Sequence, residues 1–543
     1  MLRRYLHKGR LVARFSCALL MISAMSTALA GEIEDFQNHW IYRALMLQGK
    51  LDLQAPLADA TFVTTHNSYN AAQYSNAGSY WDPNQEYSIT NQLRMGVRCM
   101  EFDVHEYFST DGWPWEWSTE LLLCHGTSDH VGCSTFDRHF SEGLAELRDF
   151  LNRSENANEV VILYIEEHID DEFGEAVDLL RAYLGNKIFR PVNGCEGIPM
   201  DISKADVLAA GKQVLLMTDG CRNGTLNQWV FGGVGHHVSG FPSGNPKDFR
   251  PYPDCGKFGR GDYESLLVRF FEDRTRLTDV FGDPGEPLKS SKMREMMRCG
   301  VNLAGMDKLT PFDGRLENQV WSWNVNEPND YGSGEDCAEH LSNGRMNDVD
   351  CGRTYRFACK DPDTGEWYVT SGSGVWSQGE DMCSAETGGY YVFAVPISGY
   401  ENELLKEAKI DEGVNNVWLN YSDGAVEGEW LPYSLGNREY RGLWHGSAGR
   451  NMTSAANPRV QFTVTGTTEV QFDLTSPVDT YLYLLDGDGN LITQDDDGGS
   501  GYNSRLRLSL QAGRYQLVAA TYSGSQVGSF LLTANAGTFG TLP

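Results

Sequence analysis

Short apolar runs that alternate with amphipathic segments are the feature that most constrains the fold of this chain. From about residue 45 to residue 310, the runs have the length of β-strands and several segments between them have the length of helices. Such alternation is typical of a parallel α/β barrel, in which helices cover the outside of the sheet. We expect strands at 61–65, 97–104, 121–124, 160–165, 214–218 and 301–306, and helices at 140–151 and 175–184.

Polar clusters lie at or just after four of these runs, and they carry side chains suited to proton transfer and cation binding. The clusters are His66-Asn67-Ser68-Tyr69, Glu101-Phe102-Asp103, Cys124-His125-Gly126 and Ile165-Glu166-Glu167-His168. Catalytic residues of parallel barrels lie at the C-terminal ends of the strands, so we expect the clusters to meet at one mouth. Imidazole titrates near neutral pH, which makes His66 and His125 candidates for proton transfer.

The oxygen donors in these clusters predict a site for a hard divalent cation. Glu101 and Asp103 are two residues apart on one predicted strand, so their side chains project to the same side. Asn67 and Glu166 add amide and carboxylate oxygens, and an all-oxygen set favours Ca2+ over Zn2+. Acid, base and cation together are what cleavage of a phosphodiester requires.

Residues 55–220 resemble the catalytic X region of phosphatidylinositol-specific phospholipase C. The resemblance rests on the four clusters and the runs at 96–103 and 161–168, which occur in the family's order and spacing. It implies an irregular parallel barrel with two catalytic histidines, here His66 and His125. In the calcium-dependent branch the metal ligands fall on Asn67, Glu101, Asp103 and Glu166. Metal-independent bacterial members carry Arg in place of Asp103, so the resemblance is to the calcium-dependent type.

The resemblance also implies a reaction and a partner. The inositol 2-hydroxyl attacks phosphorus, which releases diacylglycerol and a cyclic inositol phosphate that can then be hydrolysed. His125 corresponds to the general acid, whereas His66 contacts the phosphate or acts as base, and Glu101 is a rival base. Counterparts of the basic residues that hold extra inositol phosphates are not apparent, which favours a singly phosphorylated phospholipid head group at a membrane surface.

Two alternative functions stay open at the level of sequence. One is a glycerophosphodiester or sphingomyelin phosphodiesterase on the same kind of barrel. The sequence pattern of glycerophosphodiesterases, however, has Arg after the first histidine, where this chain has Asn67. The other is a non-catalytic carbohydrate-binding adhesin with a degenerate barrel. The presence of both His66 and His125 argues against the adhesin.

The N-terminus and the charge indicate an exported protein that does not bind nucleic acid. Residues 1–30 combine a basic stretch, an apolar run at 18–22 and a small-residue pattern at 28–30, which predict a signal peptide and a secreted protein. The formal net charge of −30 disfavours nucleic acid as a partner. No later run has the length of a membrane span. We expect a monomer.

Residues 311–450 are rich in Trp, Gly, Asn and Asp and resemble a C-type lectin-like α+β module. Segments at 321–329 and 335–359 match the second half of that domain, whereas segments from 383 to 430 match the first half, so the order is permuted. The resemblance implies that calcium and sugar hydroxyls would be bound by Glu327, Asn329, Glu335, Asn347 and Asp348. Carbohydrate is therefore a second candidate ligand.

Export predicts disulfides, and eleven cysteines follow residue 30, so at least one is unpaired. Cys99 lies inside an apolar run and is the expected buried free thiol. A bridge from Cys124 to Cys133 would close a loop. The lectin resemblance implies the disulfides Cys337–Cys351 and Cys359–Cys383. The remaining cysteines leave Cys195–Cys221 and Cys255–Cys299 as the expected disulfides of the barrel.

Residues 455–538 predict an all-β sandwich. Short strands at 460–464, 470–474, 481–485, 506–510, 515–519 and 529–533 are mostly separated by Gly, Asp and Asn turns. Segments at 478–482, 495–498, 503–506 and 512–515 resemble the bacterial pre-peptidase C-terminal domain. The predicted chain is thus a signal peptide (1–30), a barrel (45–310), a lectin-like module (311–450) and a sandwich (455–538).

Overall fold

The structure is a computed structural model. It describes residues 31–540 except 54, 109–117, 195, 219, 222, 233–245, 256–266, 268, 276–286, 333, 363, 389, 425–426, 433–438, 446–448, 455, 465–466, 488, 525 and 536–537. The predicted signal peptide and Cys195, with its predicted bond to Cys221, lie outside the described residues. The chain divides into one compact unit of residues 1–200 and 211–419 and a second of residues 201–210 and 420–543.

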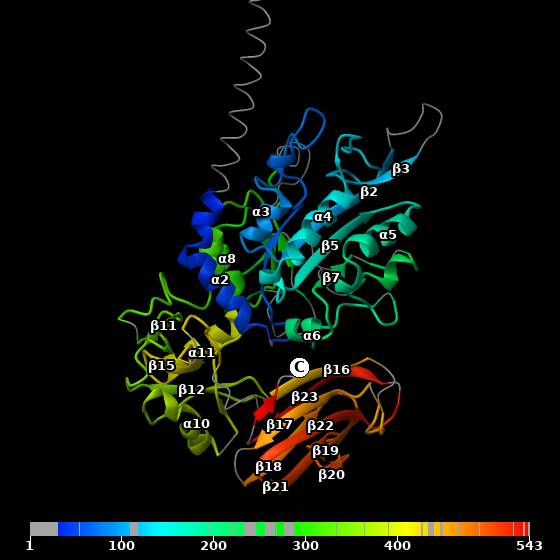
Figure 1. Ribbon diagram of the computed structural model, residues 1–543. Coiled ribbons are helices and arrows are strands. Elements are labelled where there is room, and N and C mark those ends of the chain that lie inside the picture. The colour runs from blue at the N-terminus through cyan, green and yellow to red at the C-terminus, as the bar shows by residue number, and fades with distance from the viewer. Residues whose placement is uncertain are drawn as a thin grey trace, which may run out of the picture. The chain divides into compact units, whose positions relative to one another are not determined.

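A sheet of parallel strands forms the irregular, TIM-type barrel of the first unit (Figure 1). Its strands lie in the order β6 (Ile188–Phe189), β7 (Val214–Met217), β5 (Val161–His168), β2 (Cys99–Phe108), β1 (Phe62–Thr65), β9 (Leu303–Met306) and β8 (Arg269–Phe271). All six neighbouring pairs are parallel. Their apolar residues are buried on both faces, as expected for strands covered by helices.

The helices of the barrel are amphipathic and follow the predicted pattern. They are α2 (Trp40–Leu51), α3 (Ile89–Arg94), α4 (Phe140–Leu151), α5 (Phe173–Tyr183), α8 (Ser290–Arg298) and α9 (Gly314–Gln319). In α4, the buried residues Phe140, Leu144, Leu147 and Leu151 recur at helical spacing, and Glu142 caps the first turn. The helix predicted at 140–151 is therefore confirmed.

The prediction that the strand at 121–124 belongs to the parallel set is wrong. Strand β3 (Thr119–Leu123) pairs antiparallel with β2 and also with β4 (Arg138–His139). Only ten residues separate β2 from β3, and a parallel connection requires a longer crossover. The pair β2–β3 is therefore a hairpin that extends from the barrel (Figure 1).

The middle module, residues 321–422, is an α+β structure held by two disulfides. Its sheet has the order β11 (Met346–Val349), β10 (Cys337–His340), β15 (Val417–Ser422), β12 (Arg356–Lys360) and β13 (Trp367–Val369), with β14 (Val392–Phe393) beside β12. Helices α10 (Gly379–Thr387) and α11 (Gly399–Asp411) accompany it. The last strand, β15, thus inserts between β10 and β12.

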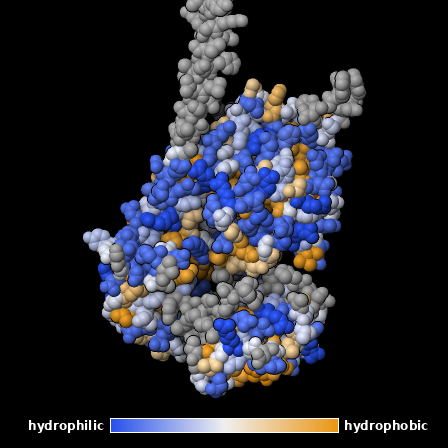
Figure 2. Space-filling model, viewed as in Figure 1, coloured by the Kyte–Doolittle hydropathy of each residue, from blue (hydrophilic) through white to orange (hydrophobic). Residues whose placement is uncertain are grey.

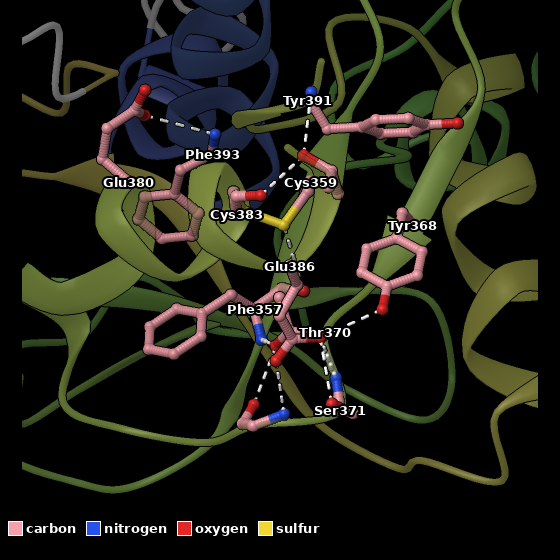
Figure 3. Close-up of a disulfide and its surroundings, with 12 residues drawn as sticks. Phe357, Cys359, Tyr368, Thr370, Ser371, Glu380, Cys383, Glu386, Tyr391 and Phe393 are labelled. Carbon is pink, nitrogen blue, oxygen red and sulfur yellow. Dashed lines mark hydrogen bonds between the residues drawn. A yellow bond between two sulfur atoms is a disulfide. The ribbon is translucent and has the colours of Figure 1, made fainter. Parts of the chain in front are cut away.

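The predicted disulfide Cys359–Cys383 joins β12 to α10 in the core of this module (Figure 3). Close by, the Glu386 carboxylate accepts hydrogen bonds from the backbone amides of Ser371 and Gly372, both at 2.7 Å. The Tyr368 hydroxyl donates to the same carboxylate at 3.0 Å. The disulfides Cys124–Cys133, Cys255–Cys299 and Cys337–Cys351 and the buried free thiol of Cys99 are also confirmed.

The second unit contains a β-sandwich with an apolar core between two antiparallel sheets. One sheet has the order β16 (Glu439–His445), β23 (Val527–Ala534), β18 (Thr468–Thr475) and β21 (Ser504–Leu510). The other has the order β20 (Leu491–Asp495), β19 (Thr480–Asp486), β22 (Gly513–Thr521), β17 (Arg459–Val464) and β24 (Thr538–Gly540). The six predicted strands are confirmed, and β16, β20 and β24 are additional.

The surface of the barrel is mostly hydrophilic on the face shown in Figure 2, in keeping with the large formal charge of the chain. Within the described residues, the helices are too short or too polar to cross a bilayer.

Candidate active site

His66 follows β1 directly and is buried between two carboxylates. Its Nδ1 lies 3.1 Å from Asp307 Oδ1, and its Nε2 lies 3.9 Å from Glu101 Oε2. The His66 amide donates to the carbonyl of Met306, the last residue of β9, at 3.2 Å. Because β1 and β9 are parallel neighbours, their C-terminal ends bring His66 and Asp307 together.

The surroundings of His66 favour its protonated form. Burial alone would disfavour the imidazolium, but the carboxylates of Glu101 and Asp307 outweigh burial and raise the pKa of His66 to about 10. Phe271 stacks on the imidazole with 5.1 Å between ring centroids. His66 is therefore a cation at neutral pH in this environment.

Asp307 is held in place by donors on its other side. Its Oδ2 accepts hydrogen bonds from Asn84 Nδ2 at 2.9 Å and from the Arg274 amide at 2.7 Å. Its own amide donates to Glu272 Oε1 at 2.8 Å. These contacts orient the carboxylate toward His66 Nδ1, so Asp307 is a positioning residue for the histidine.

Glu101 is buried and paired with Arg269 of β8. Arg269 Nη2 donates to Glu101 Oε2, and the guanidinium lies 4.6 Å from the ring centroids of Tyr164 and Phe271. Burial raises the pKa of Glu101, but the charges of Arg269 and His66 outweigh it and hold the pKa below its usual range. Glu101 is thus an ionised carboxylate.

Three carboxylates converge beside His66. Strand register places Glu166 of β5 opposite Asp103 of β2, and the side chain of Asp103 lies on the same side of β2 as that of Glu101. Ligand oxygens of the three residues lie within 4.8 Å of one another. Burial, followed by the charges of Glu166 and Glu101, raises the pKa of Asp103 well above its ordinary value. The cluster therefore favours either a proton on Asp103 or a bound cation.

Asn67 adds an amide to this cluster from the residue after His66. With its Nδ2 donating to Asn84 Oδ1 at 3.3 Å, its Oδ1 faces both carboxylate oxygens of Asp103 at 3.0 Å. Rotation of the Asn67 amide by half a turn replaces this contact between acceptors with hydrogen bonds from Nδ2 to both carboxylate oxygens of Asp103 at 3.0 Å. In the orientation without rotation, a cation would have to lie between the oxygens. Asn67 has φ +44°, a conformation that Asn tolerates. Three carboxylates and one amide fit a hard cation such as Ca2+.

His125 lies in a loop closed by the Cys124–Cys133 disulfide. The Cys124 amide donates to the Asp103 carbonyl at 3.3 Å, which fixes the start of the loop at the level of the cluster. His125 is half-buried. Among the described residues, no hydrogen bond or ion pair joins it to His66. The structure thus joins His66, Asn67, Glu101, Asp103 and Glu166 in one site, and among the described residues no hydrogen bond or ion pair joins the His125 side chain to it.

The predicted lectin site is partly assembled in the middle module. Asp348 is buried, and its Oδ2 accepts hydrogen bonds from the amides of Asn329 at 2.8 Å and Asp330 at 2.7 Å. Asn329 Nδ2 donates to Glu327 Oε2. Burial and the nearby Asp348 raise the pKa of Glu327 to about 7. Glu327, Asn329 and Asp348 therefore meet.

Of the other two predicted lectin residues, Glu335 lies near Glu327, whose pKa its charge helps to raise, whereas Asn347 contacts its own sheet. Glu335 accepts a hydrogen bond from the Tyr331 amide at 3.0 Å. Asn347 Nδ2 donates to Glu339 at 3.3 Å and to the Asp348 carbonyl at 2.9 Å. Asn347 is thus engaged within its own sheet.

Comparison with known proteins identifies the first domain. The family described as the Rv2075c PI-PLC-like domain matches residues 25–313, more than half of the chain. The chain belongs to this family. The uncharacterized protein Rv2075c of Mycobacterium tuberculosis is 31% identical over 409 residues, which cover 71% of this chain and 80% of that protein.

Three further similarities were found. The bacterial pre-peptidase C-terminal domain matches residues 459–521. Collectin-10 of Xenopus tropicalis is 54% identical over 62 residues, 11% of this chain and 22% of that protein. The phosphatidylinositol-specific phospholipase C of Listeria monocytogenes aligns with a TM-score of 0.33 and 15% identity, over 49% of this chain and 95% of that one.

Two residues of the PI-PLC-like site were missed by the sequence reasoning. Asp307 directly follows the predicted strand at 301–306, in the same position relative to its strand as His66, and that position was the available signal. Arg269 is a single charge inside the apolar run 266–271, which was not recognised as a strand. A lone cation within such a run is a signal for a buried ion pair.

Proposed function

We propose that this PI-PLC-like protein is a secreted, calcium-dependent phosphodiesterase. Its substrate would be phosphatidylinositol-type lipid, cleaved to diacylglycerol and a cyclic inositol phosphate. The observation that carries the proposal is the buried pairing of the His66 imidazolium with a cluster of carboxylates and one amide at a barrel mouth. Such a site combines a hydrogen-bond donor for phosphate with ligands for a hard cation.

The protonation states suggest how the residues divide the reaction. His66 is a cation, so it suits donation to a phosphoryl oxygen better than abstraction of a proton. Glu101 is ionised beside it and can accept the proton of the attacking hydroxyl. As the new O–P bond forms, the bond to the glycerol oxygen breaks, and His125 protonates that oxygen. This assignment makes Glu101 the base and His125 the acid.

The charges around the cluster support a divalent cation. With Asp103 ionised, Glu101, Asp103, Glu166 and Asp307 would bring four negative charges, whereas His66 and Arg269 bring two positive ones. The hydrogen bonds from Arg269 and the Asn67 amide both end on Oε2 of Glu101, so Oε1 can face a metal. Ca2+ would be held by Asn67, Glu101, Asp103 and Glu166 and would stabilise charge on the phosphoryl group.

Product analysis with and without a chelator tests the proposal. On phosphatidylinositol vesicles, we expect cyclic inositol phosphate with added Ca2+, none in excess EGTA, and recovery when Ca2+ is restored. Asp103→Asn should raise the Ca2+ concentration for half-maximal turnover by about tenfold or more, since one ligand charge is lost. The exposed Asp129→Asn is the matched control. Full turnover in EGTA would contradict the metal site, and turnover only of glycerophosphodiesters or sphingomyelin would contradict the head group.

A second function, carbohydrate binding by the middle module, is favoured by one observation. Asp348 Oδ1 is buried without a hydrogen-bond partner among the described residues, close to Glu327 and Asn329. A carboxylate oxygen in that state is a suitable ligand for Ca2+. We propose that Glu327, Asn329 and Asp348 hold Ca2+, which would chelate sugar hydroxyls.

Glycan binding and catalysis can be separated by variants in different modules. Glu327→Gln should abolish retention on immobilised mannose or galactose in Ca2+ while phosphodiesterase turnover persists. His125→Ala should do the reverse, with turnover lost and glycan retention unchanged. If no sugar column retains the wild-type chain in Ca2+, the lectin proposal fails. If the wild-type chain binds glycans but turns over no phosphodiester, the adhesin alternative is supported.

A further inference from the structure

Asn84 is a buried amide that lies between the two halves of the active site. It belongs to the segment that joins β1 to α3, and its side chain is fully shielded from solvent. On one side it contacts Asp307, the partner of His66. On the other side it contacts Asn67, a ligand of the proposed cation site. Asn84 therefore connects the histidine to the cluster of oxygen donors.

Two carboxylates fix the orientation of the Asn84 amide. Its Nδ2 donates to Asp307 Oδ2 at 2.9 Å and to Asp273 Oδ1 at 3.4 Å. An ionised carboxylate only accepts hydrogen bonds, so it has to face the nitrogen of the amide and not its oxygen. The oxygen of Asn84 therefore points away from Asp307, toward two further amides.

These two amides, Asn70 and Asn67, both donate to the oxygen of Asn84. Asn70 Nδ2 lies 2.7 Å from Asn84 Oδ1, and Asn67 Nδ2 lies 3.3 Å from it. Asn70 Nδ2 also donates to the carbonyl of Asp82 at 3.4 Å, which is again a group that only accepts. Asn70 therefore holds the oxygen of Asn84 in the same orientation as the two carboxylates do.

This arrangement decides which end of the Asn67 amide faces Asp103. With Nδ2 of Asn67 on Asn84, its Oδ1 lies on the side of the Asp103 carboxylate. Rotating the amide would satisfy Asp103, but it would place Oδ1 of Asn67 against Oδ1 of Asn84. Asn84 cannot turn away without losing its hydrogen bonds to Asp307 and Asn70. Rotation thus moves the contact between acceptors to Asn84, whereas a cation between Asn67 and Asp103 removes it.

We propose that Asn84 is a positioning residue that directs the oxygen of Asn67 toward the cation and couples the cation site to the His66–Asp307 pair. The inference rests on the proposed function for the identity of the cation, Ca2+. It adds a residue that touches neither the substrate nor the cation to those on which cation binding depends. Residues that orient metal ligands change metal affinity by about 10- to 100-fold when they are replaced.

Calorimetric titration of Ca2+ into the full chain tests the role of Asn84 without any substrate. All chains carry Glu327→Gln, so that Ca2+ in the middle module does not contribute to the heat. We expect Asn84→Ala to weaken Ca2+ binding by about tenfold or more, because the released Asn67 amide can turn and donate to Asp103.

Asn84→Asp is a second variant that keeps the size of the side chain and its acceptor for Asn67. It also adds a negative charge near the cluster, so it should bind Ca2+ at least as tightly as the parent chain. If Asn84→Asp binds Ca2+ as weakly as Asn84→Ala, the orientation of Asn67 does not depend on this acceptor and the proposal fails.

A double-variant cycle separates orientation from packing. Asn67→Asp replaces the amide with two equivalent oxygens, so no orientation remains for Asn84 to set. In that background, Asn84→Ala should change the Ca2+ dissociation constant by less than about twofold. A role in packing would instead weaken binding by the same factor in both backgrounds, and that result would overturn the proposal.

Asn302→Ala is the matched control for the loss of a buried amide. Asn302 is 1% exposed, and its Nδ2 donates to three backbone carbonyls in the segment 57–60, at the opposite end of β9 from Asp307. We expect a lower unfolding temperature and an unchanged Ca2+ dissociation constant. An equal loss of Ca2+ affinity in Asn302→Ala and Asn84→Ala would assign the effect to folding and contradict the proposal.

Turnover of phosphatidylinositol separates this inference from the proposed function. A chain that binds Ca2+ as described but releases no inositol phosphate would support the role of Asn84 and contradict the enzyme. Ca2+-dependent turnover together with a Ca2+ dissociation constant that Asn84→Ala leaves unchanged would support the enzyme and overturn the role of Asn84. Absence of Ca2+ binding in the Glu327→Gln chain would contradict both.

Discussion

Replacing His66 with Ala is expected, under the proposed function, to lower turnover of phosphatidylinositol by about 10³-fold, because it removes the buried cation that would donate to the phosphoryl group. The loss should appear in kcat, since the negative charge on the phosphoryl oxygens grows in the transition state. Single-turnover and steady-state assays measure it. His139→Ala, in which an exposed histidine 3.2 Å from Glu120 is removed, is the control and should leave kcat within about twofold. A comparable loss in both variants would contradict the role of His66.

The same variant should reveal the charge of His66 through stability. The pKa of His66 is about 10 in the folded chain and 6.5 in the unfolded one, so its ion pairs stabilise fully below pH 6.5. That contribution is lost as the pH rises toward 10. The difference in unfolding free energy between wild type and His66→Ala, measured in EGTA, should therefore shrink from pH 6 to pH 10. A difference that grows with pH would show that His66 is neutral.

The parts of the site that could be predicted are those in which a polar residue directly follows an apolar run. His66 and Asn67 follow β1, Glu166 lies two residues before the end of β5, and the alternation of Glu101 with Asp103 places both on one side. Parallel strands end at one mouth, so position along the chain was enough to bring these side chains together.

The two residues that were not predicted, Asp307 and Arg269, reach the site only through the pairing of distant strands. Asp307 lies 241 residues from His66, and it reaches the histidine only because β9 pairs with β1. Arg269 lies on a strand of three residues, too short for a periodic signal. The predicted direction of β3 was wrong for a related reason. An apolar run in the sequence does not show whether the strand lies parallel or antiparallel to its neighbour. The pKa shifts of His66 and Asp103 arise from these long-range neighbours and could not be predicted from local sequence.

Replacing Arg269 with Met is expected to have the largest effect on stability of any single change in the site. Glu101 would stay buried beside Asp103 and Glu166 without its guanidinium partner, and breaking one side of a buried ion pair costs about 3–5 kcal/mol. Denaturant unfolding in EGTA measures this loss. Arg181→Met is the control, because Arg181 forms an exposed ion pair with Asp178, and it should cost less than about 1 kcal/mol.

A double variant distinguishes the lost ion pair from a simple packing defect. Glu101→Gln combined with Arg269→Met removes both charges, so it should recover about 2 kcal/mol or more relative to Arg269→Met alone. Ca2+ should stabilise Arg269→Met more than the wild type, because the cluster gains one net negative charge that the metal can balance. If the double variant is no more stable than the single one, the role of Arg269 is packing against Tyr164 and Phe271 rather than neutralisation of Glu101.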